Sequence, residues 1–250
     1  MVVDGHCHAG IGDGLTGPWD TAAPLGAYLR RARRAGIDRT VVMAPFHSDY
    51  ATANAAVGAI VRRRPERFIG FCCVHPRRDR GRVADLIGQA VRRWGFRGIK
   101  VHAIDGAATR EVCEAARRFR LPILYDVGGR TNLVEMAASA YPDVGFIVPH
   151  LGSFLDDVRA HLHVIDQMTR MRNVHADTSA VRRFDYLLQA VRRAGPHKLI
   201  FGSDGPWLHP GVELHKVRLL GLPAEAERLV TGGNLLRLVG AEGQPARLAR

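Results

Sequence analysis

Residues 97–127 read RGIKVHAIDGAATREVCEAARRFRLPILYDV, and the order of apolar and polar residues in this segment predicts the fold class. The short apolar run at 98–103 predicts a buried strand. Residues 109–119 place apolar side chains three and four positions apart, as an amphipathic helix does. A second apolar run at 123–127 predicts another strand. A strand, a helix and a strand in succession predict a βαβ unit, whose two strands run parallel.

The same alternation extends outward through most of the 250 residues. Eight such units in a chain of this length predict the α/β class, as a single (β/α)8 TIM barrel domain over residues 1–250. An open doubly wound sheet is the alternative, but its first strand normally precedes a glycine-rich phosphate loop, and here that strand ends in histidines. Strands are expected at 2–8, 40–46, 69–75, 98–103, 123–127, 145–150, 174–179 and 199–203, with an extra helix within 224–240 and a flexible tail at 241–250.

Composition narrows the class of protein further. Hydrophobic residues make up 46% and charged residues 24%, which excludes a disordered chain. No apolar stretch approaches the ~18 residues of a membrane span. The N-terminus lacks the basic and apolar regions of a secretory signal, and the four cysteines form no CxxC pair. We therefore expect a cytoplasmic enzyme with reduced thiols and no membrane partner.

The composition is strongly basic. Lysine and arginine number 36 against 24 acidic residues, so the formal net charge is +12. The arginines form short clusters, most of them at the ends of predicted helices, where cations complement the helix dipole. No helix-turn-helix, RRM or zinc-finger pattern accompanies them. We interpret the clusters as solvent-exposed helix ends and expect no nucleic-acid partner.

The first predicted strand ends with two histidines, His6 and His8. Alternate strand residues face the same way, so both imidazoles are expected to point into the barrel mouth while Cys7 points away. Two neutral imidazoles on one face can bind a divalent metal. In barrels of this kind the active site lies at the carboxyl ends of the strands. The pair therefore predicts a metal site there.

A second candidate lies inside the fourth strand, GIKVH. Lys100 is surrounded by apolar residues, and a buried ammonium is costly unless it is paired or neutralised. A salt bridge, a lowered pKa and conversion to a carbamate that bridges two metals are the three functional fates. A lysine that extends to the rim is the structural alternative. His102 shares the face of Lys100 and lies nearer the mouth.

Three further polar residues end later strands: Asp126, His150 and Asp204. A metal lowers the pKa of its bound water to about 7, and a nearby carboxylate can accept the proton. Asp204 suits that role, and His150 suits a ligand or a transition-state donor. Trp19, in a glycine-rich loop that could act as a lid, and Trp207 are candidate substrate contacts together with His102.

As an ordered set, six segments resemble the amidohydrolase superfamily, and most of all the amidohydrolase-2 branch, which includes the aminocarboxymuconate semialdehyde decarboxylases. The resemblance extends from residue 1 to about 240. It implies His6, His8 and Asp204 as metal ligands, His150 as a ligand or acid–base group, and Lys100 as a bridging carbamate or a charged active-site group. The segments are DGHCH (4–8), RGIKVHA (97–103), LPILYDVG (121–128), YPDVGFIVPHLG (141–152), NVHADTS (173–179) and KLIFGSDGPW (198–207).

One position departs from the family pattern. The fifth strand usually ends with a metal-binding histidine, and this chain has Asp126 there. A carboxylate can still bind zinc and suits harder metals such as manganese. The site is therefore either altered, with Asp126 as a ligand, or degenerate. His102 could compensate for the missing imidazole.

These residues predict a metal-dependent hydrolase of a small molecule, acting on an amide, a lactone or a related bond. The expected cofactor is a divalent metal, zinc first and manganese second. Non-oxidative decarboxylation of a small aromatic or semialdehyde carboxylic acid is the first alternative. A barrel that has lost its metal and acts as a binding protein is the second. The expected partner is the small-molecule substrate, and the family resemblance allows a homodimer.

Overall fold

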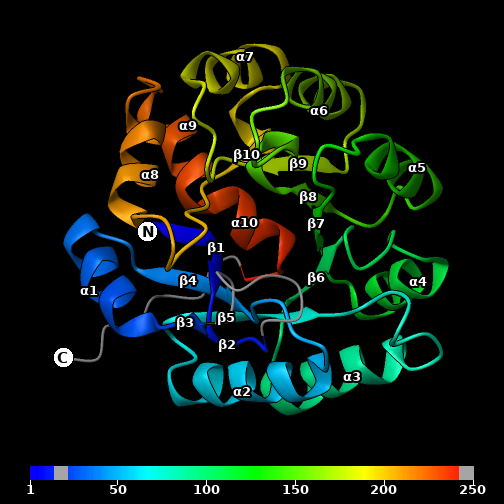
Figure 1. Ribbon diagram of the computed structural model, residues 1–250. Helices are drawn as coiled ribbons and strands as arrows, with labels where there is room; N and C mark the ends of the chain where they lie inside the picture. Colours follow the sequence, from blue (N-terminus) through cyan, green and yellow to red (C-terminus); the bar gives the residue numbers. More distant parts are fainter. Residues whose placement is uncertain (14–21, 242–250) are drawn as a thin grey trace.

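Eight parallel strands form one sheet in strict sequence order, with helices packed around it (Figure 1). The computed structural model describes residues 1–13 and 22–241. The predicted TIM barrel is confirmed, because every expected strand forms within a few residues of its predicted bounds. The strands are β1 (Val3–His8), β4 (Arg39–Met43), β5 (Phe68–Cys73), β6 (Gly98–His102), β7 (Ile123–Asp126), β8 (Phe146–Val148), β9 (Val174–Asp177) and β10 (Leu199–Ile200).

The helices follow the strands as the apolar periodicity predicts. In α3, for example, Val83, Ile87, Ala90 and Trp94 form one buried stripe, and the helix ends at Gly95, whose positive φ suits glycine. The helices are α1 (Leu25–Ala35), α2 (Tyr50–Arg63), α3 (Val83–Trp94), α4 (Arg110–Phe119), α5 (Asn132–Ala140), α6 (Val158–Arg170), α7 (Phe184–Ala194) and α8 (Pro210–Arg218). A short antiparallel pair, β2 (Gly10–Ile11) and β3 (Ala22–Ala23), lies beside the first strand. No helix in the described ranges is long and apolar enough to cross a membrane.

The barrel closes where β1 meets the end of β10. The Gly5 amide donates to the Phe201 carbonyl at 2.8 Å, and the His8 amide donates to the Gly205 carbonyl at 2.6 Å. A Cβ on Gly5 would lie 2.8 Å from Ile200 Cγ2 and 3.0 Å from the Phe201 carbonyl oxygen. Only glycine permits this approach, and the approach fixes the distance between the first and last strands.

The single helix expected at 224–240 is three short segments: α9 (Ala224–Arg228), the π-helical η4 (Leu229–Gly233) and α10 (Asn234–Leu238). Glycine is a poor helix former, and a Cβ on Gly232 would lie 2.9 Å from the Met1 carbonyl oxygen. The break therefore lets this segment pack against the start of β1. Leu235 and Leu238 then reach the amino-terminal end of the barrel, near Gly5 and Gly145. Of the predicted tail, residues 242–250 lie outside the described residues.

Candidate active site

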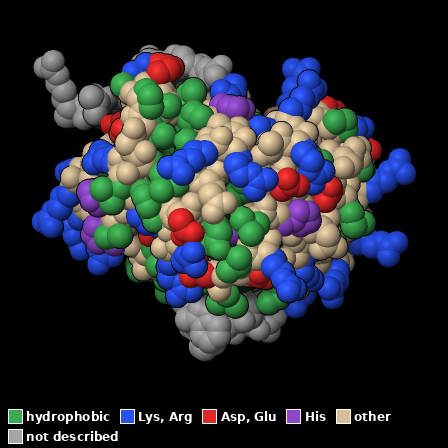
Figure 2. Space-filling view, turned by 90° about the horizontal axis from the view of Figure 1, so that it is seen from above, with side chains coloured by type: hydrophobic (Ala, Val, Ile, Leu, Met, Phe, Trp, Pro, Cys, Tyr) green, Lys and Arg blue, Asp and Glu red, His purple; other side chains and the backbone are tan. Residues whose placement is uncertain are grey.

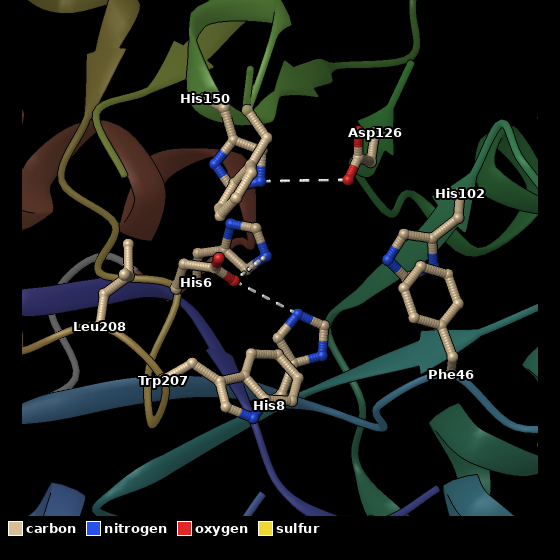
Figure 3. Close-up of a pocket in the computed structure, with 10 residues that line it drawn as sticks. His6, His8, Phe46, His102, Asp126, His150, Trp207 and Leu208 are labelled. Atoms are coloured by element: carbon tan, nitrogen blue, oxygen red, sulfur yellow. Dashed lines mark ion pairs between the residues drawn. The ribbon is translucent and has the colours of Figure 1, made fainter. Parts of the chain in front are cut away.

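Six of the predicted polar residues meet in one cavity at the carboxyl ends of the strands, and Lys100 is not among those that line it (Figure 3). The cavity has a volume of about 370 Å³. Its polar lining comes from strand ends far apart in the sequence, and its apolar lining comes from the loops that follow. Trp19 lies outside the described residues. The lining residues are His6, His8, Phe46, His102, Asp126, His150, Phe154, Asp204, Trp207 and Leu208.

Three of these side chains offer ligand atoms to a common point. Asp204 Oδ1 lies 3.5 Å from His6 Nε2 and 3.5 Å from His8 Nε2. The three atoms all lie within 4.8 Å of one another, and all three residues are buried. Two imidazole nitrogens and one carboxylate oxygen are a donor set that suits a divalent metal with an open position.

The hydrogen bonds of the two histidines determine which nitrogen faces the cavity. His8 Nδ1 lies 3.0 Å from the Ala44 carbonyl oxygen, and His6 Nδ1 lies 2.8 Å from Asp177 Oδ2. Both partners only accept, so each Nδ1 carries the hydrogen and each Nε2 presents a lone pair. Burial, together with the ammonium group of Lys100, lowers the pKa of His8 well below its usual value. Three acceptor atoms therefore converge with no hydrogen between them, and a cation fits this arrangement.

Asp177 is the residue that sequence reasoning missed. It ends β9, so the rule that singled out Asp126 and Asp204 could have found it. Burial opposes its ionisation, but hydrogen bonds from His6 and Ser179 hold the pKa of Asp177 below its usual range. A Cβ on Gly202 would lie 3.2 Å from Asp177 Cγ and 3.0 Å from His6 Cβ, so glycine leaves room for this pair.

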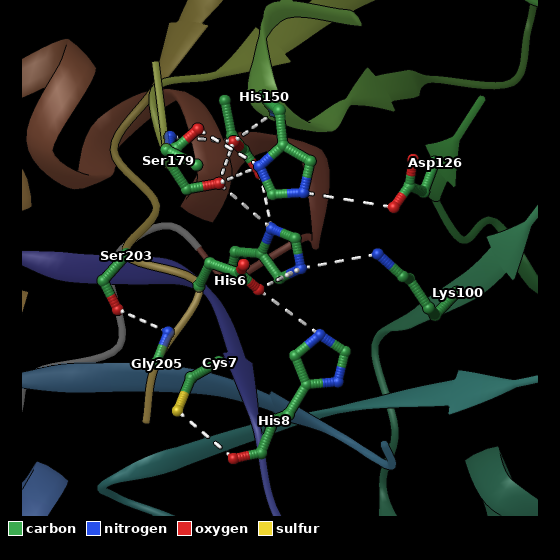
Figure 4. Close-up of polar contacts among 12 residues, drawn as sticks. His6, Cys7, His8, Lys100, Asp126, His150, Ser179, Ser203 and Gly205 are labelled. Carbon is green, nitrogen blue, oxygen red and sulfur yellow. Dashed lines mark hydrogen bonds and ion pairs between the residues drawn. The ribbon is translucent and has the colours of Figure 1, made fainter. Parts of the chain in front are cut away.

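His150 lies next to His6, with its ring centroid 5.2 Å from that of His6 (Figure 4). Its amide donates to Asp177 Oδ1 at 3.0 Å, and its Nδ1 lies 3.1 Å from the Ser179 carbonyl oxygen. Its Nε2 lies 4.0 Å from Asp126 Oδ2. The same Asp177 carboxylate thus orients His6 through one oxygen and His150 through the other.

Asp126 lies across the cavity from the three converging atoms. Its Oδ1 accepts from the Gly128 amide at 3.1 Å, which is a turn contact, and its Oδ2 faces His150. Asp126 is absent from both groups of metal-ligand atoms that lie close together in the described chain. The second of these groups joins His6 and His150 to Asp177. The assignment of Asp126 as a ligand stays a prediction.

Lys100 is buried beside the histidines, with its Nζ 3.4 Å from His6 Nε2. Within residues 1–13 and 22–241 it has no carboxylate within salt-bridge distance, so the first of its three expected fates is not observed. The ammonium group of Lys100 and a bound metal would compete for the same lone pair, on His6 Nε2. His102, on the same face, packs against Phe46 at 4.1 Å between ring centroids. Burial and the charge of Lys100 lower the pKa of His102 well below its usual value.

A network behind the first strand holds Asp204 in place. The register of β1 shifts between Asp4 and Cys7, so Asp4 turns toward Tyr28 of α1, whose hydroxyl donates to it at 2.6 Å. The Ser203 amide donates to the other oxygen of Asp4 at 2.8 Å. Burial raises the pKa of Asp4 to about 7, against the effect of these hydrogen bonds. This contact fixes the backbone just before Asp204, whose φ is 52°.

Aromatic and aliphatic side chains complete the walls. The ring centroid of Trp207 lies 4.7 Å from that of His8, and its Nε1 donates to the Ala22 carbonyl at 3.2 Å. Phe154 meets His150 edge-on at 5.1 Å. A second hollow of about 370 Å³ shares Phe46, His102, Asp126 and Phe154 with the first and adds Arg130. The cavity therefore joins a polar floor to apolar walls and opens toward one arginine.

Residues 3–241 match the Amidohydrolase family model of the amidohydrolase-2 branch, so the chain belongs to that family. The resemblance seen in its motifs is thereby confirmed. No curated protein matches the sequence.

Solved structures with the same fold include several decarboxylases. The 5-carboxyvanillate decarboxylase LigW of Sphingomonas paucimobilis shares 14% identity at a TM-score of 0.75, covering 96% of this chain and 99% of that one. The 2,6-dihydroxybenzoate decarboxylase of Rhizobium shares 14% at 0.74, covering 97% and 99%. A probable 2-pyrone-4,6-dicarboxylic acid hydrolase of Acinetobacter baumannii, with citric acid bound, shares 15% at 0.71, covering 96% and 99%. At these identities the likeness shows the fold.

Proposed function

We propose that this protein is a metal-dependent, non-oxidative decarboxylase of a small aromatic or semialdehyde carboxylic acid. The observation that carries the proposal is the convergence of His6 Nε2, His8 Nε2 and Asp204 Oδ1 beneath an aromatic-walled cavity. The decarboxylases among the structural neighbours support this alternative over the hydrolysis expected from the sequence.

His6, His8 and Asp204 would hold the cation, which would supply positive charge to bind and polarise an anionic substrate. A similar structure, a dihydroxybenzoic acid decarboxylase of Polaromonas, contains manganese. A carboxylate among the ligands also suits manganese, so we propose manganese ahead of the zinc expected from the sequence.

The residues of the cavity match the needs of decarboxylation. Phe46, Phe154 and Trp207 offer flat apolar surfaces for a ring, and Arg130 offers a guanidinium that can bind a carboxylate through two hydrogen bonds. Loss of CO2 leaves an electron pair on carbon, and that carbon must then receive a proton. Asp204 directs Oδ1 at the two histidines, so we assign its second oxygen to proton transfer: it would take a proton from water and pass it to the carbon.

The test measures CO2 release by the purified protein from a panel of hydroxylated benzoic acids and semialdehyde acids, after loading with manganese or zinc. We expect CO2 release from at least one acid and its loss in Asp204→Asn. Asp185→Asn, which removes an exposed carboxylate paired with Arg183, is the matched control and should leave the rate unchanged.

Hydrolysis is the second candidate, favoured by the fold shared with the 2-pyrone-4,6-dicarboxylic acid hydrolase. Lactones and amides in the same panel separate the two reactions. Ring opening without CO2 release would replace the decarboxylase proposal with the hydrolase. Protein that binds no metal and converts neither class of compound would instead support the degenerate barrel.

A further inference from the structure

A third hollow, far from the strand carboxyl ends, is lined almost entirely by arginine. It has a volume of about 380 Å³ and is formed by α1 and by the segment between α2 and β5. These parts lie at the amino-terminal end of the barrel, because helices end where the next strand begins. The lining residues are Leu29, Arg30, Arg33, Arg34, Arg64 and Arg67.

None of these five guanidinium groups pairs with a carboxylate within the described part of the chain. Arginines elsewhere do find such partners: Arg117 pairs with Asp143, and Arg170 with Glu135. Asp38, close to the hollow in sequence, accepts instead from the Val2 amide at 2.7 Å. Five like charges around one hollow repel one another, although water screens part of this repulsion. An anion in the hollow would reduce the repulsion.

Helix dipoles account for only part of this charge. The carboxyl ends of α1 and α2 each carry the equivalent of about half a negative charge, which favours one or two cations nearby. Five arginines exceed that need. Arg67 is also held in position, since its Nη1 donates to the Asp38 carbonyl at 3.1 Å. Other helix ends carry basic pairs as well, such as Arg92 and Arg93 of α3, but these line no described hollow with three further arginines.

We propose that this hollow binds a small, multiply charged phosphate compound. Its volume falls within the range of small-molecule sites, roughly 300–1,000 Å³. Guanidinium groups match phosphate oxygens with paired hydrogen bonds, and several of them suit a ligand with more than one phosphate. Basic side chains project from the face shown in Figure 2, but a concave group of five that has no acidic partner among residues 1–13 and 22–241 selects a compact polyanion over a long one. The site is separate from the catalytic cavity and does not depend on its function.

The test titrates the full-length protein with inorganic tripolyphosphate by calorimetry at 0.05 M and 0.15 M salt. Surface attraction is largely screened at the higher salt, where the Debye length is about 8 Å. We expect saturable binding of one tripolyphosphate at both salt concentrations. Arg33→Gln combined with Arg64→Gln should weaken it roughly tenfold or more, because two charge-assisted contacts are lost.

The double variant Arg92→Gln with Arg93→Gln is the matched control, since it removes the same charge from another helix end. It should bind tripolyphosphate within about threefold of the unmodified protein. Circular dichroism and thermal unfolding establish that both variants are folded; if the hollow variant is not, the single change Arg33→Gln replaces it. Equal weakening in both double variants would overturn the proposal in favour of diffuse charge. So would loss of binding at 0.15 M salt, or saturable binding only to duplex DNA or anionic lipid vesicles.

Discussion

The two ends of the barrel handle charge in opposite ways. At the carboxyl end, His6, His8 and His150 are buried, and each has its Nδ1 next to an acceptor of the protein. At the amino-terminal end, five arginines face one hollow without a carboxylate partner among the described residues. Buried polar groups need partners in the protein itself, whereas exposed cations can be left for water or a ligand. The side chains at the carboxyl end are therefore held in position by the protein before any ligand binds. The amino-terminal end is distinguished by its unpaired positive charge.

The largest effect is expected at the carboxyl end of the barrel, where a substitution of His6 tests metal binding. His6→Ala removes one of the three converging ligand atoms and should abolish stoichiometric metal binding. A metal contributes several kcal/mol to a transition state, so activity should fall by about 10³-fold or more. Metal analysis of the purified variant, with a steady-state assay, measures both. Unchanged metal content would remove His6 from the site.

A smaller effect is expected when the carboxylate that hydrogen-bonds to His6 and His150 is changed, and this tests whether Asp177 orients the two histidines. Asp177→Asn keeps the shape but removes the charge that orients His6 and His150. Loss of such a partner typically reduces metal affinity by 10–100-fold. Competition with a chelator gives the affinity, and Asp185→Asn serves as the control. An affinity within twofold of the unmodified protein would show that Asp177 only supports the fold.

The seam that joins the first and last strands offers a third test. Gly5→Ala places a methyl group 2.8 Å from Ile200 Cγ2 and should lower the free energy of unfolding by about 1–3 kcal/mol. Gly26→Ala is the matched control, because a Cβ there meets only Arg30 Nη1 at 3.9 Å and alanine favours a helix. Chemical denaturation measures both. Equal stability of the two variants would show that the close approach at Gly5 is not tight.

The smallest effect is a change of stability with pH that arises from one buried histidine, His175. Burial, with the charges of Lys198 and Arg237, lowers the pKa of His175 from 6.5 to about 3. The unfolded chain takes up this proton first, so stability is full above pH 6.5 and falls as the pH drops toward 3. Between pH 7 and 5.5 the loss from this residue is about 1 kcal/mol. His175→Phe should flatten this part of the pH profile; an unchanged slope would place the titration elsewhere.

Much of the catalytic end could be predicted from the sequence because its signals are local. Alternation within a single strand is enough to place these side chains. The strand-like runs concerned end in His6 and His8, in Lys100 and His102, or in Asp126. The structure of residues 224–240 was harder to predict. A helical pattern at 224–240 gave no sign of the contact between Gly232 and the Met1 carbonyl, which breaks the helix. Solvent-exposed helix ends were also predicted one by one, and their meeting in one hollow was not.

The eight alternating units, and with them the barrel and its polar strand ends, could be predicted because they depend on periodicity between near neighbours in the chain. The contacts that form across the barrel could be found only in the folded molecule. Asp177 reaches His6 from 171 positions away, and Arg33 and Arg64 line one hollow although 31 positions separate them in the sequence. Such contacts depend on closure of the sheet, whose geometry arises from the packing of all eight strands together.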